Sequence, residues 1–288
     1  MKRVLITGGT GTLGRAFIAA YREQYAFAVL SRGEAAQAAL KAEYPEVECI
    51  LGAVEDEYAV ERAFAFGPDI VIHAAAMKHV DNAERQPAQA VAINVVGSLN
   101  VLLTAQAHGA LTLIGISTDK ACDPSNVYGS TKMLMERVFI EANSNGMRAA
   151  CVRLGNIAGS NGSVIPRWKA MAAKGEALPV TDPEMFRFFC TPHAAAQTVQ
   201  AAIVRCMHGG GFVMTCRLPV VRIGDLAEAI SPNIRVVGAR PGERLHECLA
   251  AEGERIEMAD GTEVLGPWTT RDGPAATAGE LREIVACG

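Results

Sequence analysis

The sequence predicts an α/β protein with a Rossmann-like, doubly wound parallel sheet and a smaller C-terminal substrate-binding domain. Three observations support this fold class. Short apolar runs alternate with segments of helical spacing, a glycine-rich turn follows the first run, and the alternation weakens after about residue 155. Such alternation is typical of βαβ units, in which helices cover both faces of a parallel sheet.

The expected strands are short runs that are rich in β-branched and other apolar residues. They are Arg3–Ile6, Phe27–Leu30, Val47–Leu51, Asp69–Ala74, Leu111–Ile116, Ala149–Leu154 and Phe212–Thr215. Several of them are apolar at both odd and even positions, which indicates burial on both faces.

Helices are expected between these runs, where apolar residues recur at helical spacing. They are Thr12–Arg22, Glu34–Lys41, Asp56–Phe66, Pro87–His108, Asn126–Asn143, Pro166–Lys174 and Pro192–Met207. The spacing of Val91, Val95, Leu99, Leu102 and Leu103 predicts that the fourth helix is long and faces the core.

The two halves of the chain predict two domains. We expect residues 1–155 to form a nucleotide-binding domain, with about 195–220 returning to its sheet. Residues 156–288, mainly about 156–194 and 221–288, should form a lid, because glycine and proline become frequent there and regular alternation is lost.

Composition excludes several classes of function. The 288 residues are half apolar and 20% charged, so the chain can bury a core, and its net charge of −4 gives no basic excess for nucleic acid or an anionic membrane. The N-terminal apolar run stops at glycines, and we expect no bilayer-spanning run of ~18 apolar residues. A cytoplasmic location is therefore expected.

The eight cysteines are scattered and form no CxxC pair, so we expect reduced, mostly buried thiols and no metal site. His79 and His246 have no partner at metal-ligand spacing, and each is expected to make structural hydrogen bonds.

A dinucleotide site is predicted at the N-terminus. The run VLIT leads into Gly8, Gly11 and Gly14 before a helix, and glycines there allow backbone to approach a pyrophosphate at the helix N-terminus. The next strand ends in Ser31 and Arg32 rather than in an acid. An arginine and a serine suit the 2′-phosphate of NADP, so NADP is expected and NAD is less favoured.

Reactive side chains follow the Leu111–Ile116 strand. Ser117, Thr118, Asp119 and Lys120 stand at its carboxyl end, where ligands of such sheets bind. Tyr128 and Lys132 are spaced i and i+4 and therefore share one helix face, so an ammonium beside the phenol would favour the phenolate. The combination predicts a hydride-transfer enzyme.

Five strings narrow this prediction. HAAAMKHVDNAE from His73, STDKACDPSNVYGSTK from Ser117, RLGNIAGSNGSVIP from Arg153, VTDPEMFRFF from Val180 and GARPGERLHE from Gly238 cover most of the chain. In order and spacing they resemble the UDP-N-acetylglucosamine 4,6-dehydratases, in the extended branch of the short-chain dehydrogenase/reductase superfamily. The tyrosine in NVYGSTK is similar to the short, soluble, C5-inverting members, whereas long membrane-anchored relatives carry methionine there.

The resemblance implies a role for each reactive residue. Tyr128, with its pKa lowered by Lys132, would take the C4 hydroxyl proton while hydride passes from C4 to tightly bound NADP, and Thr118 would hydrogen-bond the reacting oxygen. Lys120, with its pKa lowered by burial near a cation, would take the C5 proton. Asp119 would protonate the departing C6 hydroxyl, and hydride would return to C6, which regenerates the cofactor.

The resemblance also implies two binding sets and no metal. The cofactor set is Gly8, Thr10, Gly11, Thr12, Leu13, Gly14, Ser31, Arg32, Ala74, Ala75, Ala76, Lys78, Asn94, Tyr128, Lys132 and Ile157. The UDP-sugar set is Lys78, Lys120, Asn156, Ser163, Val164, Thr181, Met185, Arg187, Arg240 and Glu243. Asn94 is expected to support Lys132 through water. Ala53 stands where relatives have an aspartate that meets adenine, so the adenine contact is expected either to be weaker or to come from Asp56.

Three alternatives remain open. They are a C5-retaining 4,6-dehydratase, a nucleotide-sugar 4-epimerase, and a non-catalytic NADP-binding regulator with the same fold. The resemblance further implies a homo-oligomer, with a UDP-sugar as the partner and with neither nucleic acid nor membrane.

Overall fold

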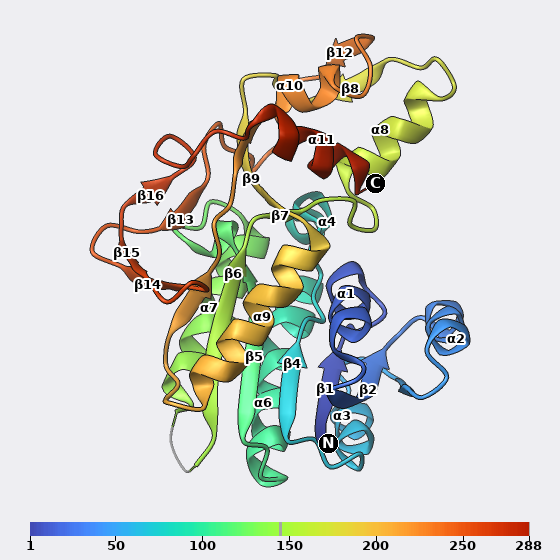
Figure 1. The fold of residues 1–288 in the computed structure, drawn as a ribbon, viewed down its shortest axis with the longest axis vertical. Coiled ribbons are helices and arrows are strands. Elements are labelled where there is room, and N and C mark those ends of the chain that lie inside the picture. Colours follow the sequence, from blue (N-terminus) through green and yellow to red (C-terminus); the bar gives the residue numbers. More distant parts are fainter. Residues whose placement is uncertain (144–145, 288) are drawn as a thin grey trace.

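The computed structural model describes residues 1–143 and 146–287, and these residues build one large sheet of nine strands (Figure 1). The order is β15-β14-β10-β6-β5-β4-β1-β2-β3, and every neighbouring pair is parallel except β14 and β15. The strands are β1 Lys2–Thr7, β2 Tyr25–Ser31, β3 Glu48–Leu51, β4 Ile70–His73, β5 Thr112–Thr118, β6 Arg148–Leu154, β10 Val213–Thr215, β14 Arg255–Met258 and β15 Glu263–Leu265. Each predicted strand is present, and the α/β fold class is confirmed.

Helices cover both faces of this sheet. On one face, α1 (Thr12–Tyr21) and α9 (Pro192–Cys206) pack together, and Phe17 and Val199 lie in the core beneath them. On the other face lie α3 (Glu57–Phe64), α6 (Gly97–Ala107) and α7 (Val127–Glu141), while α2 (Glu34–Glu43) packs beside β3. The strand order reverses between β1 and β4, and ligands of doubly wound sheets bind at such a point.

The helix expected over residues 87–108 is divided. It comprises α5 (Pro87–Val91), a π-helical turn η1 (Ala92–Val96) and α6. The buried face of this helix carries mostly small and polar residues, among them Ala90, Asn94 and Ser98, so Val91 and Leu103, which were expected in the core, are 43% and 59% exposed.

Among the described residues, the helix Pro87–Ala107 is long enough and apolar enough to cross a membrane. Core helices of globular proteins also meet this criterion of length and composition. Three of its polar residues are buried and bonded within this domain: Asn94 to Met77, Ser98 to His73, and Asn100 to Val54. These contacts make it a core helix of the sheet domain.

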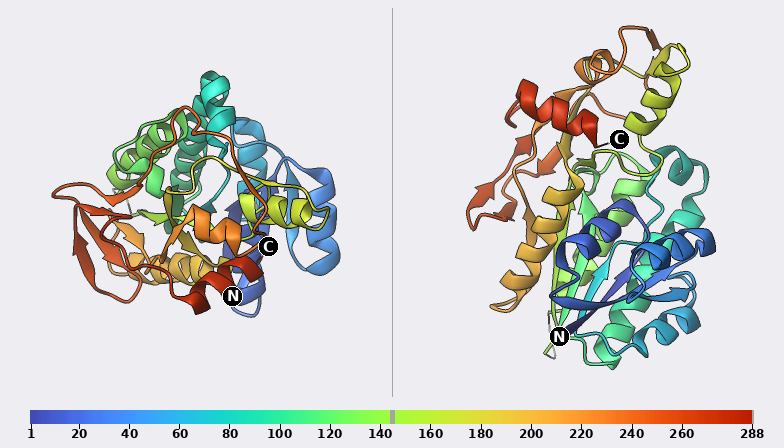
Figure 2. Two further views of the ribbon diagram at one scale, coloured as in Figure 1. Left: turned by 90° about the horizontal axis from the view of Figure 1, so that it is seen from above. Right: turned by 45° about the vertical axis from the view of Figure 1, so that its right-hand side comes forward.

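A second unit stands over the carboxyl ends of the strands. It contains the helices α8 (Val164–Ala172), α10 (Ile223–Glu228) and α11 (Ala278–Ala286), which appear yellow-green, orange and red above the sheet in Figure 2. The second unit also contains two small sheets. They are β11-β9-β7 (Val220–Arg222, Phe186–Cys190, Asn156–Ile157) and β12-β8 (Ile234–Val236, Leu178–Val180). Trp168, Phe189 and Ile284 lie in a core of its own.

The C-terminal segment differs from the prediction in one respect. Residues 255–265 were expected in the lid, but β14 and β15 extend the main sheet, because the free edge of β10 offers backbone groups for pairing. Nearby, β13 (Cys248–Ala250) pairs with β16 (Trp268–Thr269) beside the turn that follows β5. Segments this short carry too little periodicity to be predicted, and the same is true of the helix α4 (Val80–Arg85).

Candidate active site

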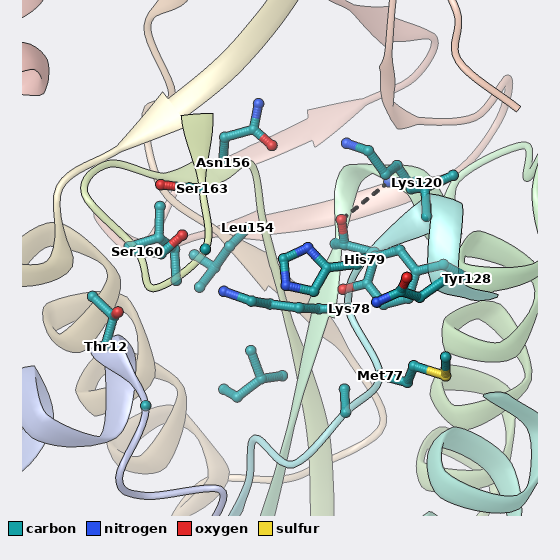
Figure 3. Close-up of a pocket in the computed structure, with 18 of the residues that line it drawn as sticks. Thr12, Met77, Lys78, His79, Lys120, Tyr128, Leu154, Asn156, Ser160 and Ser163 are labelled. Atoms are coloured by element: carbon teal, nitrogen blue, oxygen red, sulfur yellow. Dashed lines mark hydrogen bonds between the residues drawn. The ribbon is translucent and has the colours of Figure 1, made fainter. Parts of the chain in front are cut away.

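A cleft of about 1400 Å³ lies between the carboxyl ends of the central strands and the second unit. Its lining contains every residue of the predicted catalytic and binding sets except Asp119, Lys132 and Asn94, which lie behind the surface. In Figure 3, Lys120 and Tyr128 face the cavity from one side, and Asn156, Ser160 and Ser163 face it from the other.

The glycine turn at the base of the cleft forms a close-fitting cradle. Gly8 has a φ of +68°, and a Cβ there would lie 2.8 Å from the backbone of Ala75. A Cβ on Gly14 would lie 2.3 Å from the carbonyl oxygen of Gly9. Helix α1 starts after Gly11 with no side-chain cap, so its first N–H groups are available for an anion.

Two features border the end of the cleft that lies next to β2. At the end of β2, Gln37 Nε2 donates to Ser31 Oγ (3.0 Å) and Ser31 O (2.9 Å), and the exposed Arg32 follows at the rim. Glu55 also lines the cleft, and its Oε2 is buried with no hydrogen-bond partner among the described residues.

Asp56 does not take the place expected for it. It is exposed and caps α3, where its Oδ1 accepts from Tyr58 N at 3.0 Å. Of these two adjacent acids, Glu55 and not Asp56 faces the cleft. The prediction missed this residue, although it is the neighbour of Asp56, because sequence alone does not show which of two adjacent acids turns inward.

An ion-pair network lies at the end of β5, where the 3-10 turn η2 (Asp119–Ala121) begins. The fully buried Asp119 accepts through Oδ1 from Thr118 Oγ1 (2.8 Å) and Lys120 Nζ (2.9 Å). Asp119 Oδ2 is buried without a partner among the described residues. Glu247 Oε1 lies 3.4 Å from Lys120 Nζ on the other side.

The expected low pKa of Lys120 is wrong. Burial and, to a smaller extent, the Arg187 guanidinium lower the pKa, but Asp119 and Glu247 together outweigh them, so the pKa of Lys120 is raised. Lys120 is consequently held as an ammonium by two carboxylates.

Glu247 is a second residue that the prediction missed. It is 7% exposed, and it links Lys120 to Arg187, whose Nε lies 3.5 Å from Glu247 Oε1. Glu247 is the last residue of the string GARPGERLHE, and its place in that string was a signal that could have identified it. Its contact with Lys120, 127 positions earlier, forms only when the chain folds.

Tyr128 is placed in the first turn of α7. Asn126 caps this helix by accepting from Gly129 N at 2.8 Å, and Gly129 lets the helix approach η2, because a Cβ there would lie 2.1 Å from Lys120 O. Burial raises the pKa of Tyr128 to about 12, against the opposing effects of Lys120 and of a hydrogen bond with Thr118. The expectation that Lys132 lowers this pKa is wrong here, since Lys120 is the cation that acts on Tyr128.

Lys132 lies one turn further along α7 and is 1% exposed. Its Nζ donates to Met135 Sδ (2.9 Å), and burial lowers its pKa to about 8. Asn94, expected to support Lys132 through water, accepts from Met77 N (2.7 Å) and donates to Met77 O (3.1 Å) and Thr131 Oγ1 (2.9 Å). Asn94 therefore fixes the segment after β4 to α7.

The opposite wall of the cleft comes from the loop before α8. Lys78 Nζ reaches across to Asn161 O (2.8 Å), and Asn161 N donates to Thr12 Oγ1 (3.2 Å), so this loop lies over the glycine turn. Ser163 precedes α8 without capping it, and its buried Oγ has no partner among the described residues. The first N–H groups of α8 and this hydroxyl can receive an anion.

The two lid arginines differ in what they can offer a ligand. Arg187 is buried and donates to Phe186 O (2.8 Å) and Met185 Sδ (3.2 Å) in addition to facing Glu247. Arg240 is exposed at the rim, beside Glu243, which accepts from Arg240 N (2.9 Å). Arg240 is therefore the more available cation.

The remaining predicted residues have structural contacts. Thr181 Oγ1 lies 3.6 Å from Met185 Sδ, and the ring of His246 stacks on Phe186 and bonds Thr270 Oγ1 (3.0 Å). His79 faces the cavity beside Gly162 (Figure 3). The described residues contain no group of three or more His, Cys, Asp or Glu side chains placed to hold a metal ion.

Comparison with known proteins supports these assignments of fold and family. The model of the polysaccharide biosynthesis protein family matches residues 4–265. A Campylobacter jejuni protein named UDP-N-acetylglucosamine 4,6-dehydratase (inverting) is 36% identical over 88% of this chain and 78% of its own length. A Rickettsia massiliae protein named UDP-glucose 4-epimerase is 32% identical over 90% of this chain and 80% of its own length.

Among solved structures, Pen from Bacillus thuringiensis superimposes with a TM-score of 0.90 and 29% identity, covering 100% of this chain and 98% of that chain. The resemblance drawn from the five strings is confirmed by the Campylobacter relative. Because the family model matches residues 4–265 and the Campylobacter relative is 36% identical over 88% of the chain, the chain belongs to the polysaccharide biosynthesis protein family.

Proposed function

We propose that this chain is a UDP-N-acetylglucosamine 4,6-dehydratase that inverts C5 and uses NADP. The observation that carries the proposal is the buried Asp119–Lys120 pair beside Tyr128 at the wall of the cleft. Oxidation at C4 needs one base near a hydride acceptor, whereas loss of water across C5 and C6 needs an additional base and acid. The cleft offers all three groups.

The cleft fits a nicotinamide dinucleotide. The cradle at Gly8 and Gly14 suits a pyrophosphate, and the unpartnered Glu55 Oε2 suits the amino group of adenine. Arg32 and Ser31 would hold a 2′-phosphate, and this supports NADP over NAD. When bound, the nicotinamide would accept hydride and give it back.

Tyr128 is the group we assign to the C4 hydroxyl. Its pKa of about 12 keeps it protonated in the free protein at neutral pH, so it acts as a base only when nearby cations stabilise the phenolate. Lys120 already acts in that direction. Lys132, one turn further along α7, would instead support the bound cofactor. Thr118 orients the phenol through its hydrogen bond.

The Asp119–Lys120 contact can produce the acid and the base together. In the free protein the pair is an ammonium and a carboxylate, joined at 2.9 Å. Moving one proton across this contact gives a neutral amine and a carboxylic acid, with no proton taken from water. A substrate that covers the pair favours this neutral form, because two charges cost more than two neutral groups in a dry site. The amine of Lys120 then takes the C5 proton, and Asp119 protonates the C6 hydroxyl.

The lid would bind the UDP part of the substrate. The N-terminus of α8 with Ser163 suits the diphosphate, and Arg240 adds a cation at the rim. Glu243 offers carboxylate oxygens to ribose hydroxyls. Residues 74–76 also line the cleft, and the backbone of Ala75 lies against Gly8 of the glycine turn.

A nucleotide-sugar 4-epimerase is the second candidate, and the relative named UDP-glucose 4-epimerase supports it. Epimerisation at C4 requires Tyr128 and the cofactor but no base at C5. The buried Asp119–Lys120 pair is therefore the feature that favours dehydration.

Incubation with UDP-N-acetylglucosamine in D₂O, followed by proton NMR, tests the proposal. We expect a 4-keto sugar with a methyl group at C6, inverted configuration at C5 and deuterium at C5. A retained configuration at C5 would indicate a retaining dehydratase, and a galacto product without label at C5 would indicate an epimerase. No turnover by either the wild type or Lys120→Ala, with cofactor still bound, would favour a non-catalytic role.

We also propose that the protein is a cytoplasmic homo-oligomer. Val91, Val96 and Leu103 are exposed on the 87–107 helix, and Leu134 is exposed on the neighbouring α7. Exposed apolar side chains on adjacent helices suit a contact between copies. Light scattering coupled to gel filtration tests this, and a monomer at micromolar concentration would contradict it.

A further inference from the structure

Two thiols meet directly behind the candidate active site. Cys122 Sγ lies 2.9 Å from Cys248 Sγ, although the two residues are 126 positions apart in the chain. Cys122 follows Lys120 by two residues at the end of η2, and Cys248 follows Glu247 at the start of β13. A disulfide bond is about 2.05 Å long, so the sulfur atoms need to approach by only about 0.9 Å to form one.

The two thiols are chemically unequal, as an attacking and a resolving cysteine would be. Cys122 is 4% exposed, whereas Cys248 is half-buried, and its Sγ also lies 3.2 Å from Ala250 O. The Cys122 thiol donates to Cys248, and this hydrogen bond together with the Arg153 guanidinium lowers the pKa of Cys248 against the effect of burial. Burial raises the pKa of Cys49, Cys151, Cys190, Cys206, Cys216 and Cys287.

We propose that Cys122 and Cys248 form a reversible redox site that takes peroxide as its oxidant. The Cys248 thiolate attacks one oxygen of hydrogen peroxide, which breaks the O–O bond, leaves a sulfenic acid and releases hydroxide. The Cys122 thiol then displaces the sulfenic oxygen as water, and the disulfide forms. Overall, two thiols lose two electrons and two protons, and one peroxide becomes two waters. A dithiol restores the reduced pair by exchange.

The disulfide would act on the neighbouring site through the two segments that it joins. It ties the turn that carries Asp119 and Lys120 to the strand preceded by Glu247. The Glu247 carboxylate then stays beside Lys120, which remains an ammonium and cannot serve as a base. Oxidation therefore lowers turnover, an expectation that rests on the proposed function, whereas formation of the bond does not.

The test uses the full-length protein with its cofactor bound. After brief treatment with hydrogen peroxide, free thiols are blocked with N-ethylmaleimide and the peptides are mapped by mass spectrometry. We expect a cross-linked Cys122–Cys248 peptide, a mass lower by two hydrogen atoms, and full reversal by dithiothreitol. Turnover of UDP-N-acetylglucosamine should fall and recover in parallel with the cross-link.

Two variants sharpen the result. Cys287→Ser removes a partly buried thiol that packs against the core of the second unit, and this variant should form the same cross-link at the same rate. Cys248→Ser should abolish the cross-link and leave turnover insensitive to peroxide. Other cysteine pairs, or over-oxidation of Cys248 without a cross-link, would overturn the proposed site. A cross-link with unchanged turnover would overturn its coupling to Lys120, and a cross-link in a protein that never turns over this substrate would contradict the proposed function alone.

Discussion

Lys132 is expected to lower the free energy of unfolding of the protein, although turnover requires it. Its ammonium is 1% exposed, and its nearest hydrogen-bond partner is the thioether of Met135. Burial lowers the pKa from 10.5 to about 8, a difference that corresponds to about 3 kcal/mol of unfavourable interaction with the charged form. Replacement of Lys132 by methionine removes the charge and keeps an apolar chain of similar length.

We therefore expect Lys132→Met to raise the free energy of unfolding of the cofactor-free protein at pH 7 by up to about 3 kcal/mol while abolishing turnover. Urea denaturation at a series of pH values measures this. Below pH 8 Lys132 is charged in both states, and the cost of burial is fully present. Between pH 8 and 10.5 only the unfolded chain keeps the proton, so wild-type stability should rise toward that of the variant.

Lys120→Met is the matched control, because it removes the other buried lysine of the site. It leaves Asp119 and Glu247 without their shared cation, so we expect a loss of about 3 kcal/mol. A loss of stability in Lys132→Met at pH 7, or a difference from the wild type that does not change between pH 7 and 10.5, would refute the reasoning for Lys132.

Three further predictions concern chemistry and cofactor choice. Tyr128→Phe should lower turnover by about 10²- to 10⁴-fold with the cofactor still bound, and single-turnover kinetics with fluorescence of the bound cofactor check both parts. Glu247→Gln removes one carboxylate that stabilises the Lys120 ammonium, so proton transfer from Lys120 to Asp119 becomes easier and loss of water in a single turnover should be faster than in the wild type, whereas an unchanged or slower step would contradict that role. Arg32→Ala should weaken NADP more than NAD in calorimetric titrations, and equal losses would show that Arg32 does not meet the 2′-phosphate.

Local sequence patterns were sufficient to predict the regular alternation of strands and helices in the main sheet domain. The seven apolar runs became strands of the main sheet, because a strand buried on both faces must be apolar at successive positions. The buried face of the 87–108 helix was not predictable from apolar spacing, since it includes the polar residues Asn94, Ser98 and Asn100. The hairpin at 255–265 joined the main sheet through backbone pairing, which side-chain patterns do not encode.

In the candidate site, too, local sequence patterns predicted some residues and not others. The glycine turn and the strand-end residues Thr118 to Lys120 lie beside one another in sequence, so local patterns located them. Glu247 and Glu55 acquire their roles only from distant neighbours. The pKa values of Tyr128 and Lys120 followed from burial and from carboxylates brought near by the fold, and these outweighed the effects expected from spacing along one helix.

The path of one hydrogen atom tests the central claim most directly. We propose converting UDP-N-acetylglucosamine that carries deuterium at C4, in ordinary water, and locating the label by NMR and mass spectrometry. If the cleft oxidises C4 and then reduces C6, the deuterium appears in the C6 methyl group, and the C5 hydrogen comes from solvent. Deuterium that returns to C4 in an epimerised sugar, or a substrate recovered unchanged, would contradict the account.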